Sequence, residues 1–203
     1  MTEKKIRIKF IFLVFFLILS FIMSFSIGRY PIKFFDVIKV IIDRIFYGII
    51  DNSPASTVIW NIRIPRVLCT ILVGAGISTS GALYQGLLKN PMVSPDILGT
   101  TQAAAFGCAF GILMYFNFFE ITLLSFSLGI LSVFVTYTLS KIFRSDRILG
   151  LILTGMMIGS LFSSLISFVK LVADTENQLP SITYWLMGSF ASIKMIDFKF
   201  IFF

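Results

Sequence analysis

The sequence predicts an all-α polytopic membrane protein. We expect a bundle of about five complete transmembrane helices plus the start of a sixth, with one interfacial amphipathic helix. Three observations predict this class. Apolar residues make up 57% of the 203-residue chain, and Phe alone supplies 24 residues, which suits contact with lipid. Charged residues make up only 13%, about half their usual share in a soluble domain. The mean hydropathy is +0.96.

The basic excess and the missing histidine narrow the function. The formal net charge is +7, but basic residues cluster near span ends, where they set topology and meet anionic lipid, so we expect no nucleic-acid partner. The chain has no His, the commonest metal ligand and general base, so we expect no enzyme, no catalytic residue and no metal site. Cys69 and Cys108 lie in apolar runs and are expected to be small buried residues.

The first apolar run follows a basic segment. Four basic residues between positions 4 and 9 precede residues 10–27, which carry no charge over eighteen residues. This length is enough to cross a bilayer core at about 1.5 Å per residue. A cleaved signal peptide is the alternative, because residues 24–26 resemble a cleavage site. The run is longer than a typical signal core and more spans follow, so we favour an uncleaved first helix.

Residues 34–50 are apolar but interrupted by charges. Asp36, Lys39 and Asp43 fall at i, i+3 and i+7, which places them on one helical face. This pattern predicts an amphipathic helix that lies at the membrane interface. Residues 51–54 then end it with polar and turn-forming side chains.

Further apolar runs are separated by turn-forming or polar breaks. The predicted spans cover residues 67–84, 97–116, 121–140 and 148–169. A polar stretch at 174–181 precedes a tail at 196–203 that resembles the first turns of a sixth span. The densest basic clusters, before residue 10 and after residue 140, then share one side of the membrane, which favours a cytoplasmic N-terminus.

Small residues recur every fourth position in three predicted spans. Small side chains on one helix face let backbones approach closely where lipid supplies no hydrophobic drive. We expect these positions to be helix-packing surfaces, with ligand contact as the alternative. They are Gly74 and Ser78 with nearby Gly81, then Gly99, Ala103, Gly107 and Gly111, then Gly155, Gly159 and Ser163.

Two absences in the sequence concern the source of energy. No Gly-x-x-x-x-Gly-Lys loop occurs, so we expect no cofactor in this chain, and any ATP to be bound by a partner subunit. No carboxylate falls inside the apolar core of a predicted complete span, whereas ion-coupled carriers usually keep ionisable groups at membrane depth. This counts against a self-powered secondary transporter.

Two blocks of sequence are more specific than composition. Residues 62–99 contain Arg63-Ile64-Pro65-Arg66, Gly74-Ala75, Ser80-Gly81, Gln85, Asn90-Pro91, Pro95 and Leu98-Gly99, and residues 184–189 read Tyr-Trp-Leu-Met-Gly-Ser. This order resembles the FecCD-type permeases of bacterial ABC importers, which take up ferric siderophores, haem and cobalamin. The resemblance covers the chain after Arg29. Ala103-Ala104 and Met92-Val93 depart from the family pattern, and residues 1–203 resemble a single permease domain truncated on its C-terminal side.

The resemblance gives individual residues expected roles. Arg63 and Arg66 would dock an extracytoplasmic substrate-binding protein at the outer mouth of the second span, with anchoring to lipid phosphate as the alternative. The turn from Gln85 through Asn90 and Pro91 to Pro95 would shape the inner end of the translocation path, with a plain structural turn as the alternative. The aromatic pair at 184–185 is expected to lie at the membrane interface.

The implied protein is the N-terminal portion of a transmembrane permease subunit in the bacterial plasma membrane. It would import an iron chelate, such as a ferric siderophore or a related metal complex, by alternating access. The implied partners are a second permease subunit in a homo- or heterodimer, cytoplasmic ATPase subunits, the binding protein and membrane lipid. A secondary transporter without an ATPase, a membrane-bound enzyme and a truncated fragment that no longer transports are the alternatives.

Overall fold

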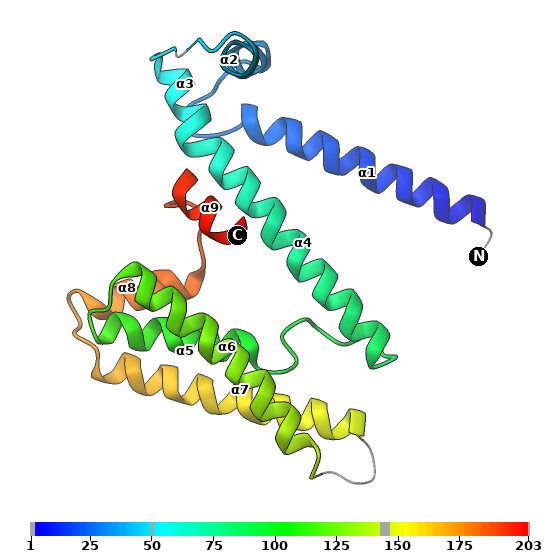
Figure 1. The fold of residues 1–203 in the computed structure, drawn as a ribbon, viewed down its shortest axis with the longest axis vertical. Coiled ribbons are helices and arrows are strands. Elements are labelled where there is room, and N and C mark those ends of the chain that lie inside the picture. The colour runs from blue at the N-terminus through cyan, green and yellow to red at the C-terminus, as the bar shows by residue number, and fades with distance from the viewer. Residues whose placement is uncertain (1–2, 50, 143–146, 203) are drawn as a thin grey trace. The chain divides into compact units, whose positions relative to one another are not determined.

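The computed structural model describes residues 3–49, 51–142 and 147–202, and over these ranges it contains helices and no strand, which confirms the predicted all-α class (Figure 1). The elements in chain order are α1 (Glu3–Ser26), α2 (Phe34–Phe46), α3 (Pro54–Val58), the π-helical turn η1 (Ile59–Arg63), α4 (Ile64–Leu87), α5 (Thr100–Leu113), α6 (Phe118–Ser140), α7 (Arg147–Val172), α8 (Gln178–Met187) and α9 (Met195–Phe202).

Among the described residues, four helices are long and apolar enough to cross a membrane. They are Glu3–Ser26, Pro54–Leu87, Phe118–Ser140 and Ile148–Val172. These helices match the predicted spans at 10–27, 67–84, 121–140 and 148–169. The start of the sixth predicted span is helical as α9, whose last residue is Phe202.

The span predicted at 97–116 is shorter than expected. Its helix, α5, has 14 residues and is therefore about 21 Å long, against an apolar bilayer core of about 30 Å. The helix cannot begin earlier because its N-cap, Gly99, has a left-handed backbone with φ of 75°. After Leu113 the chain turns, and Tyr115 takes a φ of 57°. The non-helical chain at the two ends of α5 must therefore be enclosed by neighbouring protein rather than by lipid.

Two compact units divide the chain. One comprises Met1–Ala75 with Phe190–Phe203, and the other comprises Gly76–Ser189. The boundary falls inside α4, so this helix contributes its first half to one unit and its second half to the other.

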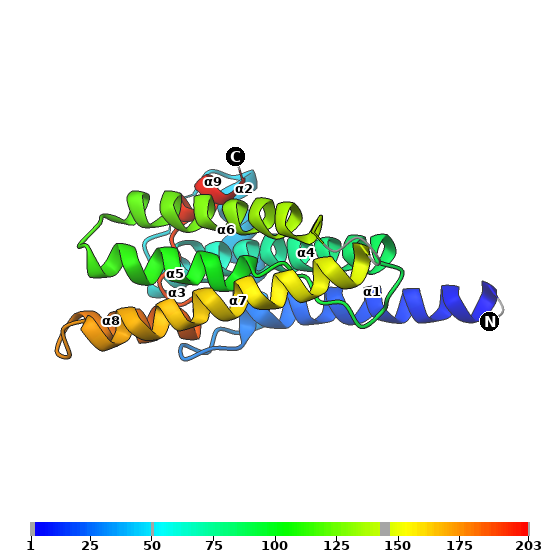
Figure 2. The same cartoon turned by 90° about the horizontal axis from the view of Figure 1, so that it is seen from below.

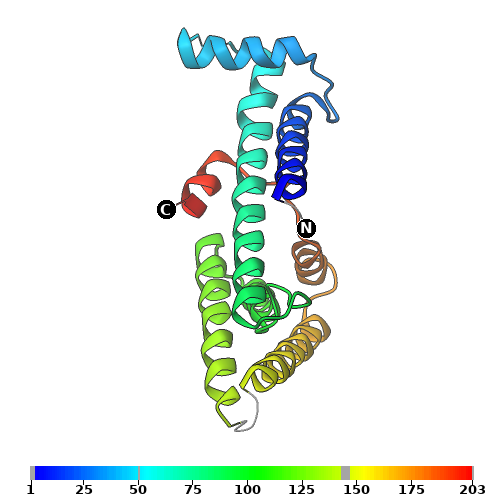
Figure 3. The ribbon, with the colours of Figure 1, turned by 90° about the vertical axis from the view of Figure 1, so that its right-hand side faces the viewer.

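In the first unit, α2 lies crosswise to the long helix that starts at Pro54 (Figure 3). Phe25, Ile32, Val37 and Ile59 form the buried core between these elements and the end of α1. The Arg44 guanidinium lies 4.7 Å from the centre of a tryptophan ring, Trp60. One face of α2 is thus fixed to protein.

The rest of α2 is divided between apolar and polar surface. Phe35 and Phe46 are 81% and 77% exposed, while Asp36, Lys39 and Asp43 mark the polar side. An exposed apolar face beside a charged one is typical of a helix at a membrane interface. The helix ends at Phe46, earlier than the predicted 50, and Gly48 follows with a φ of 65°. Ile50 lies outside the described residues.

The second unit is built around α5, which lies between α6 and α7 (Figure 2). Ala109 on α5, Val169 and Ala173 near the end of α7, and Ile182 on α8 form its buried core. A Cβ added to Gly107 would lie 2.8 Å from the Cα of Ser125 on α6. The backbones of α5 and α6 therefore touch where a larger side chain would separate them.

The segment just before α5 is closely approached by α6 and α7. A Cβ added to Gly155 would lie 2.0 Å from the carbonyl oxygen of Ile97, and one added to Gly99 would lie 2.9 Å from the amide nitrogen of Gly159. On the other side, the buried hydroxyl of Thr136 donates to the Leu98 carbonyl over 3.2 Å. Non-helical backbone survives at membrane depth only when protein encloses it in this way.

The predicted packing positions fall into two groups. One group is buried, and it comprises the N-cap and three residues of α5, two residues of α7 and the α4 residue that faces Pro95, namely Gly99, Ala103, Gly107, Gly111, Gly155, Gly159 and Gly81. Gly74, Ser78 and Ser163 are exposed, and a Cβ on Gly74 would meet no atom within 4 Å. Both cysteines are buried and free, as expected.

Replacing Gly155 by Ala is expected to destabilise the chain, because the new methyl group meets a main-chain oxygen that cannot rotate away. We expect a cost near the upper end of the roughly 1–3 kcal/mol typical of overpacking, measured by thermal unfolding in detergent. Gly76→Ala is the matched control, since its Cβ would meet nothing within 4 Å. Equal effects of the two substitutions would show that Ile97 does not pack on Gly155.

Candidate functional site

The long second span begins thirteen residues before the predicted start at 67, at Pro54. Ser53 caps it by accepting a hydrogen bond from the Ser56 amide at 3.2 Å. Asp51 accepts from both the amide and the hydroxyl of Ser53, at 3.0 and 2.6 Å. These hydrogen bonds to the charged form hold the pKa of Asp51 below its ordinary value. Pro54 suits the first turn of a helix, where a missing N–H costs nothing.

Pro65 lies inside this helix without ending it. Proline has no N–H to donate, and its ring crowds the carbonyl four residues earlier, here that of Asn61. The preceding segment, Ile59–Arg63, is a π-turn in which the Ile64 amide donates to the Ile59 carbonyl. A π-turn inserts one extra residue into the helix, and such insertions are frequent at functional sites. Pro65 itself is fully buried.

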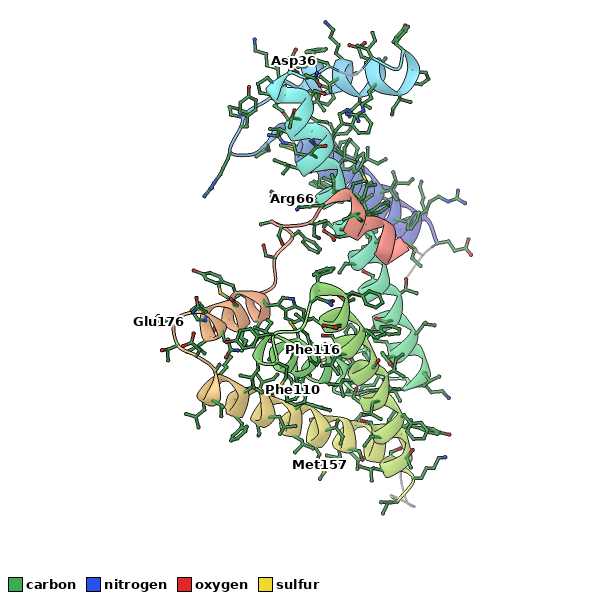
Figure 4. The ribbon with its side chains drawn as sticks, turned by 60° about the vertical axis from the view of Figure 1, so that its left-hand side comes forward. Asp36, Arg66, Phe110, Phe116, Met157 and Glu176 are labelled. Atoms are coloured by element: carbon green, nitrogen blue, oxygen red, sulfur yellow. The ribbon has the colours of Figure 1, made fainter. Side chains whose placement is uncertain are left out.

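Arg63 and Arg66 flank this proline, but their guanidinium groups have different surroundings. Arg63 is 7% exposed and donates from Nη1 to the Phe25 carbonyl and from Nη2 to the Tyr30 carbonyl. Arg66 is half-buried and lies where α4 meets the segment before α9 (Figure 4), donating from Nη2 to the Ala191 carbonyl. The Nε of Arg66 is buried and has no hydrogen-bond partner within the described residues.

The predicted inner turn brings its four candidate residues together. α4 persists through Gln85 to Leu87, so the break runs over residues 88–99 rather than 85–95. The Gln85 side-chain amide donates to the Val93 carbonyl at 3.3 Å. Asn90 accepts from the Met92 amide at 2.9 Å, which closes a turn around Pro91.

Pro95 completes this turn by packing on α4. A Cβ added to Gly81 would lie 3.4 Å from the Pro95 ring, so the chain returns close to the helix it has just left. Lys89, with a φ of 49°, turns the chain out of α4. The turn is thus held to α4 by the Gln85 hydrogen bond at one end and by Pro95 at the other.

The sequence interpretation missed an exposed face on α7. A shallow groove runs along this face, and Met157 marks it in Figure 4. The groove is lined by Leu153, Met156, Met157, Ser160, Leu161 and Ser164. The hydroxyl groups of Ser160 and Ser164 donate to carbonyls one turn back, at 2.9 and 3.0 Å. The available signal was the four-residue spacing of Met156, Ser160 and Ser164 beside that of Leu153, Met157 and Leu161.

The aromatic pair of the second sequence block lies on α8. Tyr184 and Trp185 are 74% and 47% exposed, while Gln178 fixes the start of the helix by donating to the Leu113 carbonyl at 3.0 Å. Asp174, just before α8, accepts from the Asn177 amide at 2.9 Å. This bond is the largest cause of a pKa of Asp174 below its ordinary value.

Comparison with known proteins places this geometry in a family context. The model of the FecCD transport family matches residues 16–203. The molybdate import system permease protein MolB of Haemophilus influenzae is 34% identical over 186 residues, which is 92% of this chain and 55% of that protein. A probable iron chelatin transport system permease protein of Helicobacter pylori is 32% identical over 68% of this chain and 41% of its own length.

The fold comparison agrees with the sequence comparison. A solved structure described as an inward-facing conformation of a metal-chelate type ABC transporter superposes with a TM-score of 0.77 at 33% identity. It covers 94% of this chain, and this chain covers 56% of it. The vitamin B12 import system permease protein BtuC of Photorhabdus laumondii is 32% identical over 66% of this chain and 41% of its own length. The chain thus spans about half the length of the curated relatives it matches.

Replacing Asn90 by Ala is expected to loosen the turn, because the Met92 amide loses its acceptor at a cost of about 1 kcal/mol. Asn90→Asp is the matched control, since it keeps the acceptor oxygen. The measurement is the rate of tryptic cleavage after the exposed Lys89, which should rise several-fold for Ala and stay near the wild-type rate for Asp. Equal rates in all three proteins would mean that the Asn90 side chain does not hold the turn.

Proposed function

The chain belongs to the FecCD transport family, and on this premise we propose that it forms part of the membrane-spanning permease subunit of an ABC importer. The observation that supports this function best is the match of the family model to residues 16–203. The agreement extends to the fold, since 94% of the chain superposes on a metal-chelate type ABC transporter. Its single permease domain corresponds to about half of such a subunit.

The proposed substrate is a transition-metal compound. The relatives are named for import of molybdate, an iron chelate and vitamin B12, and each of these solutes contains a transition metal. An iron chelate such as a ferric siderophore is one member of this class. The three relatives share 32–34% identity with this chain, so identity does not favour one solute over another.

The proposed mechanism is alternating access powered from outside this chain. A second permease subunit would complete the path, ATPase subunits would bind ATP on the cytoplasmic side, and an extracytoplasmic protein would deliver the substrate. The exposed small residues Gly74 and Ser78 on α4 leave a surface on which another helix could pack closely. We place the protein in the bacterial plasma membrane with its N-terminus in the cytoplasm, in accord with its basic N-terminal segment.

Two sites follow from this topology. The turn formed by Gln85, Asn90, Pro91 and Pro95 would lie toward the cytoplasm and shape the inner end of the path. Arg66 would lie at the outer end of the second span and dock the binding protein. Its guanidinium is half-buried rather than enclosed, and the proposed contact is an ion pair between its accessible part and an acidic side chain of the binding protein.

Affinity purification of this chain from its native membrane in mild detergent tests the proposed function. We expect co-elution of an ATPase and of a soluble extracytoplasmic binding protein, because a permease of this family works only in that assembly. Mass spectrometry of all co-eluting proteins is the measurement. A stably inserted chain that recovers neither partner would contradict the importer assignment and favour a protein that no longer transports.

Replacing Arg66 by Ala is expected to weaken the recovered binding protein's affinity about tenfold and to flatten the dependence of its association rate on salt, as for an interfacial charge. Surface plasmon resonance on the permease in nanodiscs measures both. Arg29→Ala is the matched control, because Arg29 is an exposed arginine outside the Arg63–Arg66 motif. If Arg29→Ala has the same effect, general charge and not Arg66 attracts the binding protein.

A further inference from the structure

Arg63 is a buried arginine that belongs to an internal contact. Only 7% of its side chain is exposed, and in the described part of the chain its guanidinium meets main-chain carbonyls rather than a carboxylate. A residue that docks a soluble protein or anchors the helix to lipid phosphate must present its guanidinium outside the protein. Arg63 does not meet that requirement.

The carbonyls that Arg63 reaches lie at the end of α1 and in the connection that follows it. The last carbonyls of a helix have no partner within the helix and carry its partial negative charge. α1 ends at Ser26, and the Phe25 carbonyl accepts from Nη1 of Arg63. Nη2 reaches Tyr30, four residues beyond the helix end. One guanidinium therefore supplies both hydrogen-bond donors and a positive charge where α1 needs them.

The connection after α1 is shaped around this guanidinium. A Cβ added to Gly28 would lie 3.0 Å from the Nη2 of Arg63, tighter than an ordinary contact, so a glycine leaves the space that the arginine occupies. The connection is also closed on itself, because the Ser26 hydroxyl donates to the Ile32 carbonyl at 2.9 Å. Ile32 in turn lies in the buried core with Phe25 and Ile59.

We infer that Arg63 caps the C-terminal end of α1 from within the second span, fixing residues 25–30 to the π-turn and leaving Arg66 as the docking arginine of the pair. The two arginines, three residues apart, thus have different tasks. Arg63 is a positioning residue that holds the N-terminal helix against the segment from which Arg66 projects. The capping of α1 by Arg63 goes beyond the proposed function and does not depend on it, whereas the docking role left to Arg66 rests on that function.

The test compares Arg63 variants of the full chain in lipid nanodiscs by two measurements. We expect Arg63→Ala to lower the thermal unfolding midpoint by roughly 5–10 °C and to raise tryptic cleavage after the exposed Lys33 about tenfold. Arg63→Lys should fall between, since one ammonium lacks the planar fork that reaches two carbonyls. Arg29→Ala is the control for melting and should keep the wild-type unfolding midpoint. Arg66→Ala is the control for proteolysis and should keep the wild-type rate of cleavage after Lys33. Unchanged melting and cleavage for Arg63→Ala would overturn the inference.

A double-mutant cycle tests the contact between Gly28 and Arg63 by changing Gly28. It can replace the first test if the Arg63→Ala protein is too unstable to measure. Gly28→Ala crowds the Nη2 of Arg63, so it should lower the midpoint in the wild-type background and have little effect when residue 63 is Lys or Ala. A Gly28→Ala effect of the same size in every background would show that Gly28 does not accommodate Arg63. Loss of binding-protein affinity in Arg63→Ala with wild-type melting and cleavage would instead assign Arg63 to docking.

Discussion

Main-chain polar groups inside lipid must find partners within the protein, and this constraint governs the structure. Regular helices satisfy most of them, but every helix end leaves carbonyls or amides over. Buried polar side chains supply several of the missing donors here. Arg63 serves the end of α1, Thr136 serves the turn before α5, and Gln178 serves the end of α5. Each joins elements that are distant in sequence, so satisfying the backbone also fixes the packing.

Close backbone approach is the second consequence of a lipid environment. Apolar side chains gain little by leaving lipid for protein, so contact area between helices must come from backbones that touch. Gly107 admits α6 and Gly155 admits the chain before α5. The same residue type on α4, at Gly74, meets nothing within 4 Å. The same four-residue spacing of small residues therefore occurs on α5 and α7, where other parts of the chain cover it, and on α4, where none of the described residues covers Gly74.

The sequence predicted most of the fold because hydropathy and length determine where a chain can cross a bilayer. The predicted ends of individual helices were wrong where the local backbone conformation determines them. Gly99 delays the start of α5, and the π-turn lets the second span continue through Pro65 from a start at Pro54. The sequence predicted a break from Gln85 to Pro95, and the structure has a break there that starts later, at residue 88, because α4 continues to Leu87. Arg63 and Arg66 looked equivalent because spacing shows a shared face and carries no information about the loop of residues 25–30 that covers one of them.

The shortness of α5 has a consequence for biosynthesis. A 14-residue helix is a weak signal for insertion, since a stable crossing needs about 20 apolar residues. Chains emerge N-terminus first, so α5 leaves the ribosome before α6, α7 and α8, the elements that enclose it. It must therefore wait beside the translocation machinery, or enter the bilayer only when the later helices arrive. Membrane integration of this part of the chain is thus a collective event, in which one segment becomes a membrane helix only through those synthesised after it.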